Sequence, residues 1–387
     1  MKKSDSPTFQ RNGINNILLV QLGDIGDVVL TFPCIRALRE NFPEAQIAVA
    51  VREKARELID DCTWADVTIF VDQKKRGVLE QFLYQVRFLR KLRSFQFDLC
   101  IDMRTGDRGA ILALLSGASL RIGYYEENGN CWRNKVFTHL SHIGYTPDQY
   151  VGDYLLSLLV AYGFGTENIQ PEMKVTYHRE KEAESLLTTE MLQPHDPFVA
   201  LQPFSLWEYK EWGTEKFARL IDWIQERYHL PVVLIGTAFE KERSFEITEK
   251  CTHPAVNLMG KTSIGALSAV IKQAKLFIGV DSVGVHMAGA VGTPSVTIFG
   301  PSSPVSWAPR GPKHLVIQKD MPCVPCRQKG CEGSEISHCL IDLQVEEVAQ
   351  AVEQQLETHL TRAPVKQQQK GFTGQAETQR MKGTFPQ

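Results

Sequence analysis

Carboxylate, amine and hydroxyl side chains recur in this sequence directly after short apolar runs. The loop 23–27 (GDIGD) follows the run 17–22 (ILLVQL) and precedes a helix-like segment. A carboxylate there could act as a general base that takes a proton from an attacking hydroxyl. Asp27 is the first candidate for this base and Asp24 is the second, whereas the plainer interpretation is that Asp27 caps the helix. The glycines do not form G-x-G-x-x-G and no Walker lysine follows, so neither a dinucleotide site nor a P-loop is indicated.

A second loop of this kind comes late in the chain, at 279–290 (GVDSVGVHMAGA). Free N–H groups at the start of a helix bind anions, and the helix dipole adds to that attraction. Asp281 and Ser282 stand where such a helix begins, and the small residues near them would let a diphosphate approach. Both are also ordinary capping residues, and His286 on its own would be a packing histidine. Its position one turn into a helix that faces a cleft makes it a candidate for the site.

These loops need a framework, and the order of apolar runs and helical patterns predicts one. Strand-like runs lie at 17–22, 46–51, 67–71 and 97–102, and again at 197–202, 231–236, 276–280 and 295–299. Helical patterns separate them, among them 27–41, 78–93, 214–228, 239–251 and 284–290. Such alternation predicts an α/β protein with two doubly wound, parallel-sheet domains that meet within 166–197. Ligands bind beyond the carboxyl ends of parallel strands, so both loops should face a central cleft.

Composition narrows the class of protein. The 387 residues include 43% hydrophobic and 23% charged residues and carry a net charge of −2. These values exclude a wholly disordered chain or a coiled-coil rod, and they argue against nucleic acid as a partner. No secretory signal or membrane-spanning run is evident, so we expect a cytoplasmic protein. We expect residues 1–13 and the Gln- and Lys-rich residues 361–387 to be disordered.

Four stretches resemble glycosyltransferase family 9, the heptosyltransferases of bacterial lipopolysaccharide core assembly. They are LGDIGDVVLTFPCIRALRENFP, FDLCIDMRTGDRGAILALLSGASLRIGY, QPFS with KEW, and FIGVDSVGVHMAGAVGTPSVTIFGPSSPVSWAP. The last is the most specific, because D-S-x-x-x-H followed by G-T-P and F-G-P is rare by chance. The resemblance spans about residues 16–358 and implies a GT-B fold of two Rossmann-like domains. It places the acceptor on residues 14–175 and the nucleotide sugar on residues 176–360.

The resemblance also implies a role for each residue that matches a family motif. Asp27 falls on the general base and Lys210 on the lysine that contacts the donor diphosphate. The remaining matches are Ser205, Glu240, Asp281, Ser282, Gly284 and His286 on the donor side and Arg104 and Arg108 on the acceptor side. Glu240 would hold the ribose hydroxyls. Val283 and Phe204 depart from the family pattern, which usually has Gly after the hydroxyl residue and Pro-Gly before the serine.

The reaction that the resemblance implies is inverting transfer of a heptose from ADP-heptose to the lipopolysaccharide inner core. It needs no metal or other cofactor, since a lysine and a helix N-terminus can stabilise a departing diphosphate. Three alternatives remain open. The chain could use another nucleotide sugar, or it could bind a sugar nucleotide without catalysis. A nicotinamide-dependent oxidoreductase is the third, although the first loop lacks its glycine pattern.

Two further features fall outside this scheme. Cys323, Cys326, Cys331 and Cys339 lie within seventeen residues, which suits either a structural zinc ion or reduced thiols. The segment 74–93 carries seven basic residues against one acidic residue. Val78, Phe82, Val86, Leu89 and Leu92 recur there at helical spacing and predict a core-facing stripe. Its charged face is either solvated or a contact for anionic lipid head groups or a phosphorylated acceptor at the inner face of the inner membrane.

Overall fold

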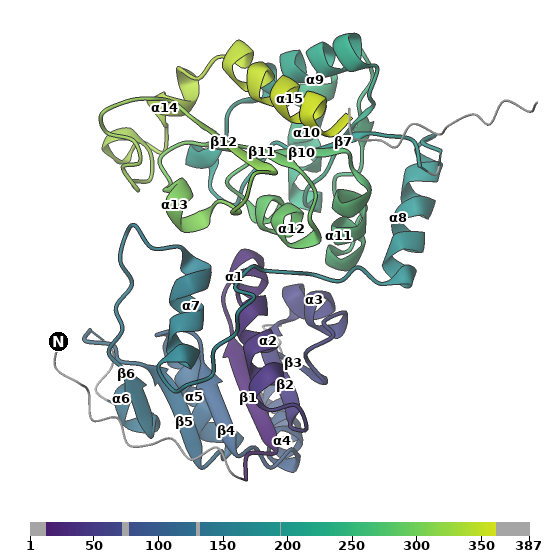
Figure 1. Cartoon of the computed structure of the whole chain (residues 1–387). Coiled ribbons are helices and arrows are strands. Elements are labelled where there is room, and N and C mark those ends of the chain that lie inside the picture. The colour runs from purple at the N-terminus through teal and green to yellow at the C-terminus, as the bar shows by residue number, and fades with distance from the viewer. Residues whose placement is uncertain (1–12, 72–76, 129–131, 194, 361–387) are drawn as a thin grey trace, which may run out of the picture.

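A computed structural model describes residues 13–71, 77–128, 132–193 and 195–360 (Figure 1). The segments that were expected to be disordered, 1–13 and 361–387, therefore lie outside the described residues apart from Gly13. Across the described ranges, no helix is both long and apolar enough to cross a membrane.

Two separate parallel sheets of six strands form the framework, as the alternation of strands and helices predicts (Figure 1). The first has the order β3-β2-β1-β4-β5-β6 and the second the order β12-β11-β10-β7-β8-β9. The strands of the first sheet are β1 (Asn16–Gln21), β2 (Gln46–Arg52), β3 (Val67–Val71), β4 (Leu99–Asp102), β5 (Leu120–Tyr124) and β6 (His139–Ser141). Those of the second are β7 (Val199–Gln202), β8 (Val232–Leu234), β9 (Val256–Asn257), β10 (Leu276–Val280), β11 (Ser295–Phe299) and β12 (His314–Gln318). The central strands read as continuous apolar runs because helices cover both of their faces.

Helices of the first half differ from the prediction at one instructive place. They are α1 (Ile25–Leu30), α2 (Phe32–Asn41), α3 (Arg56–Asp60), α4 (Val78–Ser94), α5 (Asp107–Ser116), α6 (Arg133–Val136) and α7 (Val151–Val160). The single helix predicted over 27–41 is in fact α1 and α2, which meet at Thr31. Pro33 has no amide hydrogen to donate, so it belongs in the first turn of a helix and not in its middle.

Helices of the second half follow the same pattern. They are α8 (Tyr177–Thr189), α9 (Thr214–Tyr228), α10 (Lys241–Thr248), α11 (Ile264–Gln273), α12 (Val283–Val291), α13 (Pro304–Trp307), α14 (His338–Ile341) and α15 (Val345–Leu360). Short 3-10 turns η1 (Glu53–Ala55), η2 (Glu208–Lys210), η3 (Ala238–Glu240) and η4 (Cys331–Gly333) complete the list. The helix predicted over 239–251 is split between η3 and α10.

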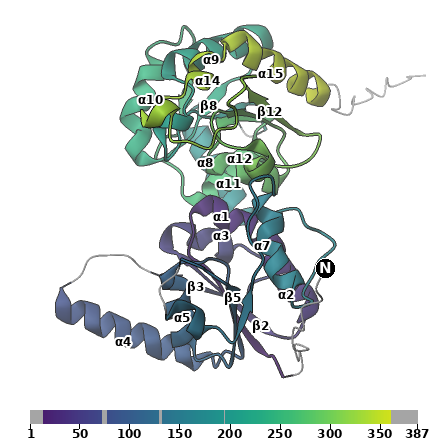
Figure 2. The same cartoon turned by 90° about the vertical axis from the view of Figure 1, so that its left-hand side faces the viewer.

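The prediction for α4 is wrong in one respect. Leu92 is buried, but Val78 and Phe82 of the same apolar stripe are exposed. The first part of α4 projects away from the first half, so it has no core to face (Figure 2). The basic residues at 74–76 lie outside the described residues.

The two halves touch along the carboxyl ends of their central strands. Helix α1 of the first half lies against α12 of the second (Figures 1 and 2). Polar contacts join the halves on either side of these helices. The Tyr145 hydroxyl donates to Ser306 Oγ at 2.7 Å, and the Gly265 N–H donates to Glu57 Oε2 at 2.8 Å. The loops that carry the predicted site therefore face one another.

Candidate functional site

Asp27 lies in the first turn of α1, the helix that follows β1. The helix N-cap is Asp24, and Asp27 is its third helical residue, so the interpretation of Asp27 as the cap is wrong. The backbone N–H of Asp24 donates to Asp27 Oδ2 at 2.9 Å, which fixes the carboxylate at the helix start. The cap falls on Asp24 because the turn through Gly23 sets Asp24 in the extended conformation that an N-cap adopts.

Arg104 also binds Asp27. Its Nη1 lies 2.6 Å from Asp27 Oδ2, the same oxygen that accepts from the backbone. A Cβ on Gly23 would lie 2.3 Å from that oxygen, so only glycine leaves room for the pair. Among the described residues, both hydrogen bonds to this carboxylate fall on Oδ2, which leaves Oδ1 for another proton.

Asp24 is the weaker candidate for a base. Its carboxylate accepts from Lys54 Nζ at 2.7 Å and from Arg52 Nη1 at 3.2 Å. The hydrogen bond from Lys54 lowers the pKa of Asp24, although partial burial opposes that shift. A carboxylate held between two cations takes up a proton less readily, so the geometry favours Asp27.

Lys210 is the corresponding cation of the second half. It ends η2, and its Nζ lies 2.7 Å from Oδ2 of the buried Asp281. Ser205 lies beside this pair and donates from Oγ to the Asp281 carbonyl oxygen at 3.4 Å. The fold thus brings together three of the residues that the sequence assigned to the donor side.

The start of α12 holds a contact that the sequence did not reveal. Ser282 is the N-cap, and the Gly284 N–H donates to the side-chain oxygen of Gln202 at 2.9 Å. The Gln202 amide also donates to Ser282 Oγ at 3.3 Å. A Cβ on Gly284 would lie 2.3 Å from Gln202 Oε1, so the glycine makes room for this side chain. Gln202 ends β7, within the QPFS stretch.

His286 stands where the halves meet. It is buried, and a Cβ on Gly26 of α1 would lie only 2.9 Å from its Cδ2. Burial lowers the pKa of His286; Asp281 and Asp27 oppose this shift and Lys210 adds to it. His286 thus lies on α12 against Gly26 of α1, the residue next to Asp27. Within the described parts of the chain, its buried Nδ1 has no hydrogen-bond partner.

A cavity of about 270 Å³ opens beside Lys210 between the halves. Tyr145 and Pro147 line it from the first half. Its other walls include Ser303, Trp307 and Arg327. A smaller cavity of about 150 Å³ lies next to His286, and Tyr150 and Arg310, whose guanidinium carbon lies 4.2 Å from the centre of the tyrosine ring, also line it. The site is therefore a hollow that both halves build.

Two predicted residues lie apart from this centre. Glu240 accepts a hydrogen bond from the Thr237 backbone N–H at 2.6 Å, which closes the turn that begins η3. Arg108 is exposed on the first turn of α5, and in the described chain no interaction joins it to Asp27. Of the two arginines assigned to the acceptor, the structure brings Arg104 alone to the carboxylate.

The four late cysteines carry free thiols. Cys339 is buried on α14, and burial raises its pKa to about 11, with the neighbouring thiols adding to the shift. In the part of the chain that the structure describes, no group of three or more His, Cys, Asp or Glu side chains is arranged to hold a metal ion. Zinc at Cys323, Cys326, Cys331 and Cys339 stays a prediction.

Sequence reasoning missed a buried ion pair behind Arg104. Asp102 ends β4, and Arg133 of α6 approaches it to 3.8 Å with both side chains buried. Arg133 Nη2 donates to the Arg104 carbonyl at 2.9 Å, and the Arg104 N–H donates to Asp102 Oδ1 at 3.2 Å. The pair therefore holds the main chain of the residue that holds Asp27. Burial raises the pKa of Asp102 to about 7, while the Arg104 N–H and the charge of Arg133 oppose that shift.

Comparison with known proteins agrees with this architecture. Residues 85–336 match the model of glycosyltransferase family 9 (heptosyltransferase). A relative from Escherichia coli K12, lipopolysaccharide heptosyltransferase 3, is 28% identical over 288 residues, which cover 73% of this chain and 82% of that protein. The crystal structure of a family 9 glycosyltransferase from Veillonella parvula has a TM-score of 0.76 at 22% identity, covering 89% of this chain and 97% of that one. The structure of E. coli ADP-heptose lipopolysaccharide heptosyltransferase II has a TM-score of 0.74 at 19% identity and covers 89% and 99%. These similarities confirm the expected GT-B fold.

Proposed function

Because this chain belongs to glycosyltransferase family 9, we propose that this glycosyltransferase moves a heptose from ADP-heptose to the lipopolysaccharide inner core. The E. coli relative named above supports the sugar and the acceptor, since most of both chains align. The donor is supported by the name of the E. coli structure that shares the fold, an ADP-heptose transferase. We assign the acceptor to residues 14–175 and the donor to residues 176–360.

One observation carries this proposal: Asp27 and Lys210 come from opposite halves, Asp27 on α1, which lies against α12, and Lys210 in contact with Asp281 just before α12. Asp27 is the general base. The acceptor hydroxyl oxygen attacks the anomeric carbon while Asp27 Oδ1 takes its proton. Arg104 and the Asp24 N–H both bind Oδ2, so the other oxygen is left to take the proton.

Lys210 and the N-terminus of α12 stabilise the leaving group. As the new bond forms, the bond from the anomeric carbon to the diphosphate breaks and ADP leaves with the electron pair. Lys210 is already held by Asp281, so the diphosphate joins or displaces that carboxylate. Lys210 and the N-terminus of α12 supply the positive charge that the leaving diphosphate needs, which supports transfer without a catalytic metal. A single displacement inverts the anomeric centre.

The remaining donor residues have supporting roles in this proposal. Ser205 and Ser282 line the diphosphate, with Gly284 and His286 behind them. Glu240 binds the ribose hydroxyls from η3, with the oxygen that does not accept from Thr237. Arg108 meets the acceptor at the rim of the first half, where its exposure leaves the guanidinium accessible.

The acceptor is lipid-linked in this proposal, so the enzyme works against the inner face of the inner membrane.

A zinc ion on the four cysteines would brace the loop that contains η4 and would take no part in the transfer. Elemental analysis of the purified protein tests this prediction directly: one zinc per chain supports it, and no bound metal contradicts it.

Nucleotide selectivity tests the proposed donor. We expect ADP to raise the melting temperature of the full chain, and UDP, GDP and CDP to raise it much less. Release of ADP from ADP-heptose should then require a lipopolysaccharide core acceptor. A selective response to UDP would overturn the donor, and an ADP response with no turnover on any core acceptor would leave a binding protein instead of an enzyme.

A further inference from the structure

Helix α4 exposes apolar side chains where a soluble protein usually buries them. Val78 is 91% exposed, Leu79 72%, Phe82 63% and Leu83 44%. All four lie in the first two turns of the helix, in the part that projects from the first half (Figure 2). Single exposed apolar residues need no explanation, but a contiguous group on a protruding helix marks an interaction surface.

The same helix is strongly basic. Arg87, Arg90, Lys91 and Arg93 stand against one acidic residue, Glu80, and all four basic side chains are exposed. They follow the apolar group along the helix within three turns. An apolar group beside a cluster of cations is the composition of a helix that lies in a membrane interface.

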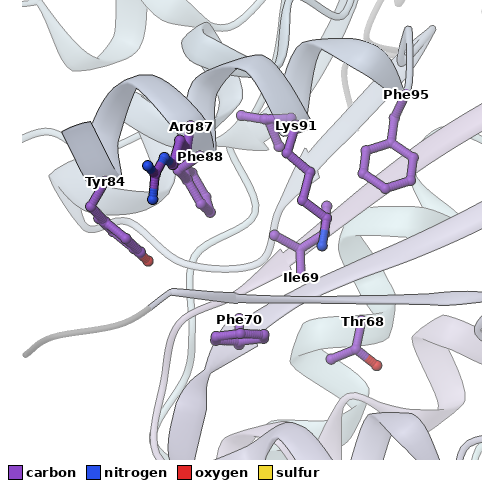
Figure 3. Close-up of a pocket in the computed structure, with 9 residues that line it drawn as sticks. Thr68, Ile69, Phe70, Tyr84, Arg87, Phe88, Lys91 and Phe95 are labelled. Carbon is purple, nitrogen blue, oxygen red and sulfur yellow. The ribbon is translucent and has the colours of Figure 1, made fainter.

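An apolar hollow lies beneath α4. It has a volume of about 200 Å³ and separates the helix from the edge strand β3. Phe70 lines it from the strand and Phe88 from the helix, as Figure 3 shows. Arg87 and Lys91 line it as well, so two positive charges lie next to the apolar space. Such a hollow suits an amphiphile with an apolar chain and an anionic head.

We propose that the surface formed by α4 and the hollow beneath it docks this protein on an anionic lipid bilayer. The apolar residues of the first two turns enter the interface, and the basic residues behind them meet lipid phosphates. This inference rests on the proposed function, because a lipid-linked acceptor must be reached at a membrane.

Charge complementarity selects this occupant over a second copy of the chain. Two copies that met through α4 would bring their basic clusters together, and like charges in contact oppose association. An anionic bilayer satisfies both parts of the surface, since its acyl boundary accepts apolar side chains and its head groups attract arginine and lysine.

Vesicle binding by the full chain tests the proposal. We compare sedimentation with phosphatidylcholine vesicles and with vesicles that also contain phosphatidylglycerol. The wild type should bind the anionic vesicles at least about tenfold more tightly than the neutral ones. Leu79→Ser combined with Phe82→Ser should lower that affinity by at least about tenfold, and so should Arg90→Gln combined with Lys91→Gln. Met191→Ser, at a residue 87% exposed on the other half, is the matched control and should bind as the wild type.

Equal binding to both kinds of vesicle would overturn the proposal, and so would α4 variants that bind like the wild type. An α4-dependent dimer that ignores vesicles would identify the surface as an interface between copies. Failure of the proposed function would give a different result from failure of the docking proposal: the wild type would then transfer no heptose to a soluble, acyl-free core acceptor. The α4 variants should keep that soluble transfer, because none of their substitutions touches the cleft.

Discussion

Asp102 shows how a single buried side chain can support the carboxylate of Asp27, the proposed base, through Arg104. Together with Arg133 it fixes the main chain of Arg104, whose guanidinium binds Asp27. The side chains of Asp102 and Arg133 are both buried, so we regard them as positioning residues. Loss of either one should move Arg104 without removing it.

Stability should depend on pH through Asp102. Its pKa rises from 3.8 to about 7 on folding, mainly because of burial. Between these values the native state keeps a proton that the unfolded state releases, so stability falls as pH rises from about 4 to about 7. The contribution is at most about 1.4 kcal/mol per pH unit.

Urea unfolding at several pH values checks this prediction. Asp102→Asn cannot titrate, so the variant should lose this part of the pH dependence while other groups keep theirs. If the variant and the wild type lose stability in parallel between pH 4 and pH 7, the proton does not reside on Asp102.

Helix α1 carries Asp27, the proposed base, and lies against α12, and Gly26 sets how closely these two helices approach. Gly26→Ala would place a methyl group 2.9 Å from His286 Cδ2. Both halves should stay folded, but α1 would move away from α12. A shift of about 1 Å between reacting groups can lower turnover by about a hundredfold, so we expect kcat to fall by between about tenfold and a hundredfold.

Steady-state kinetics and thermal unfolding measure this effect together. Gly144→Ala is the matched control, because a Cβ there meets no atom within 4 Å. The control should leave kcat unchanged. Unchanged kcat in Gly26→Ala would mean that the contact between α1 and α12 is not needed for transfer.

The elements that the sequence predicts well are those with continuous apolar runs. Strands such as β1 and β10 are buried on both faces, so composition alone identifies them. Once the ends of these strands are identified, the loops that follow them are identified as well, and with them Asp27 and Asp281. Gln202 was missed because its partner Gly284 is 82 positions away, and no local pattern marks such a contact.

The prediction that the apolar stripe of α4 faces the core failed for a different reason. Helical spacing shows that apolar residues share a face, but it does not show what that face meets. Val78 and Phe82 are exposed, and Figure 2 shows that the first part of α4 projects away from the other elements, which no sequence pattern reveals. The buried pair of Asp102 and Arg133 has no periodic signature at all.

Buried apolar side chains of α1 and α12 and the partly buried Arg179, which pairs with Glu57 and Asp61, join the two halves. Exposed ion pairs at the edge of the cleft add to these contacts. Arg310 of the second half binds both oxygens of Asp153 on α7, at 3.1 and 2.7 Å. Exposed pairs of this kind contribute at most about 1 kcal/mol, so they adjust the relative position of the halves without fixing it. Added salt should weaken these exposed pairs and so favour opening to a small extent.

Arg310→Gln should raise KM for the donor by about two- to fivefold and leave kcat nearly unchanged. Donor affinity falls because the open form becomes more populated, whereas the reacting groups are intact once closed. Kinetics and the radius of gyration from small-angle scattering, with and without ADP, measure the change. Arg219→Gln breaks a pair with Glu346 inside the second half and is the control. Equal effects of the two substitutions would contradict this role for Arg310.

The central claim is that a carboxylate from one half and an ammonium from the other act on the same bond. Asp27→Asn tests it most directly, because the amide keeps the shape of the carboxylate but cannot take the proton. We measure ADP binding by calorimetry and heptose transfer on the same samples, and we expect turnover to fall by at least about a hundredfold with nearly unchanged ADP affinity. Turnover close to that of the wild type would contradict the account.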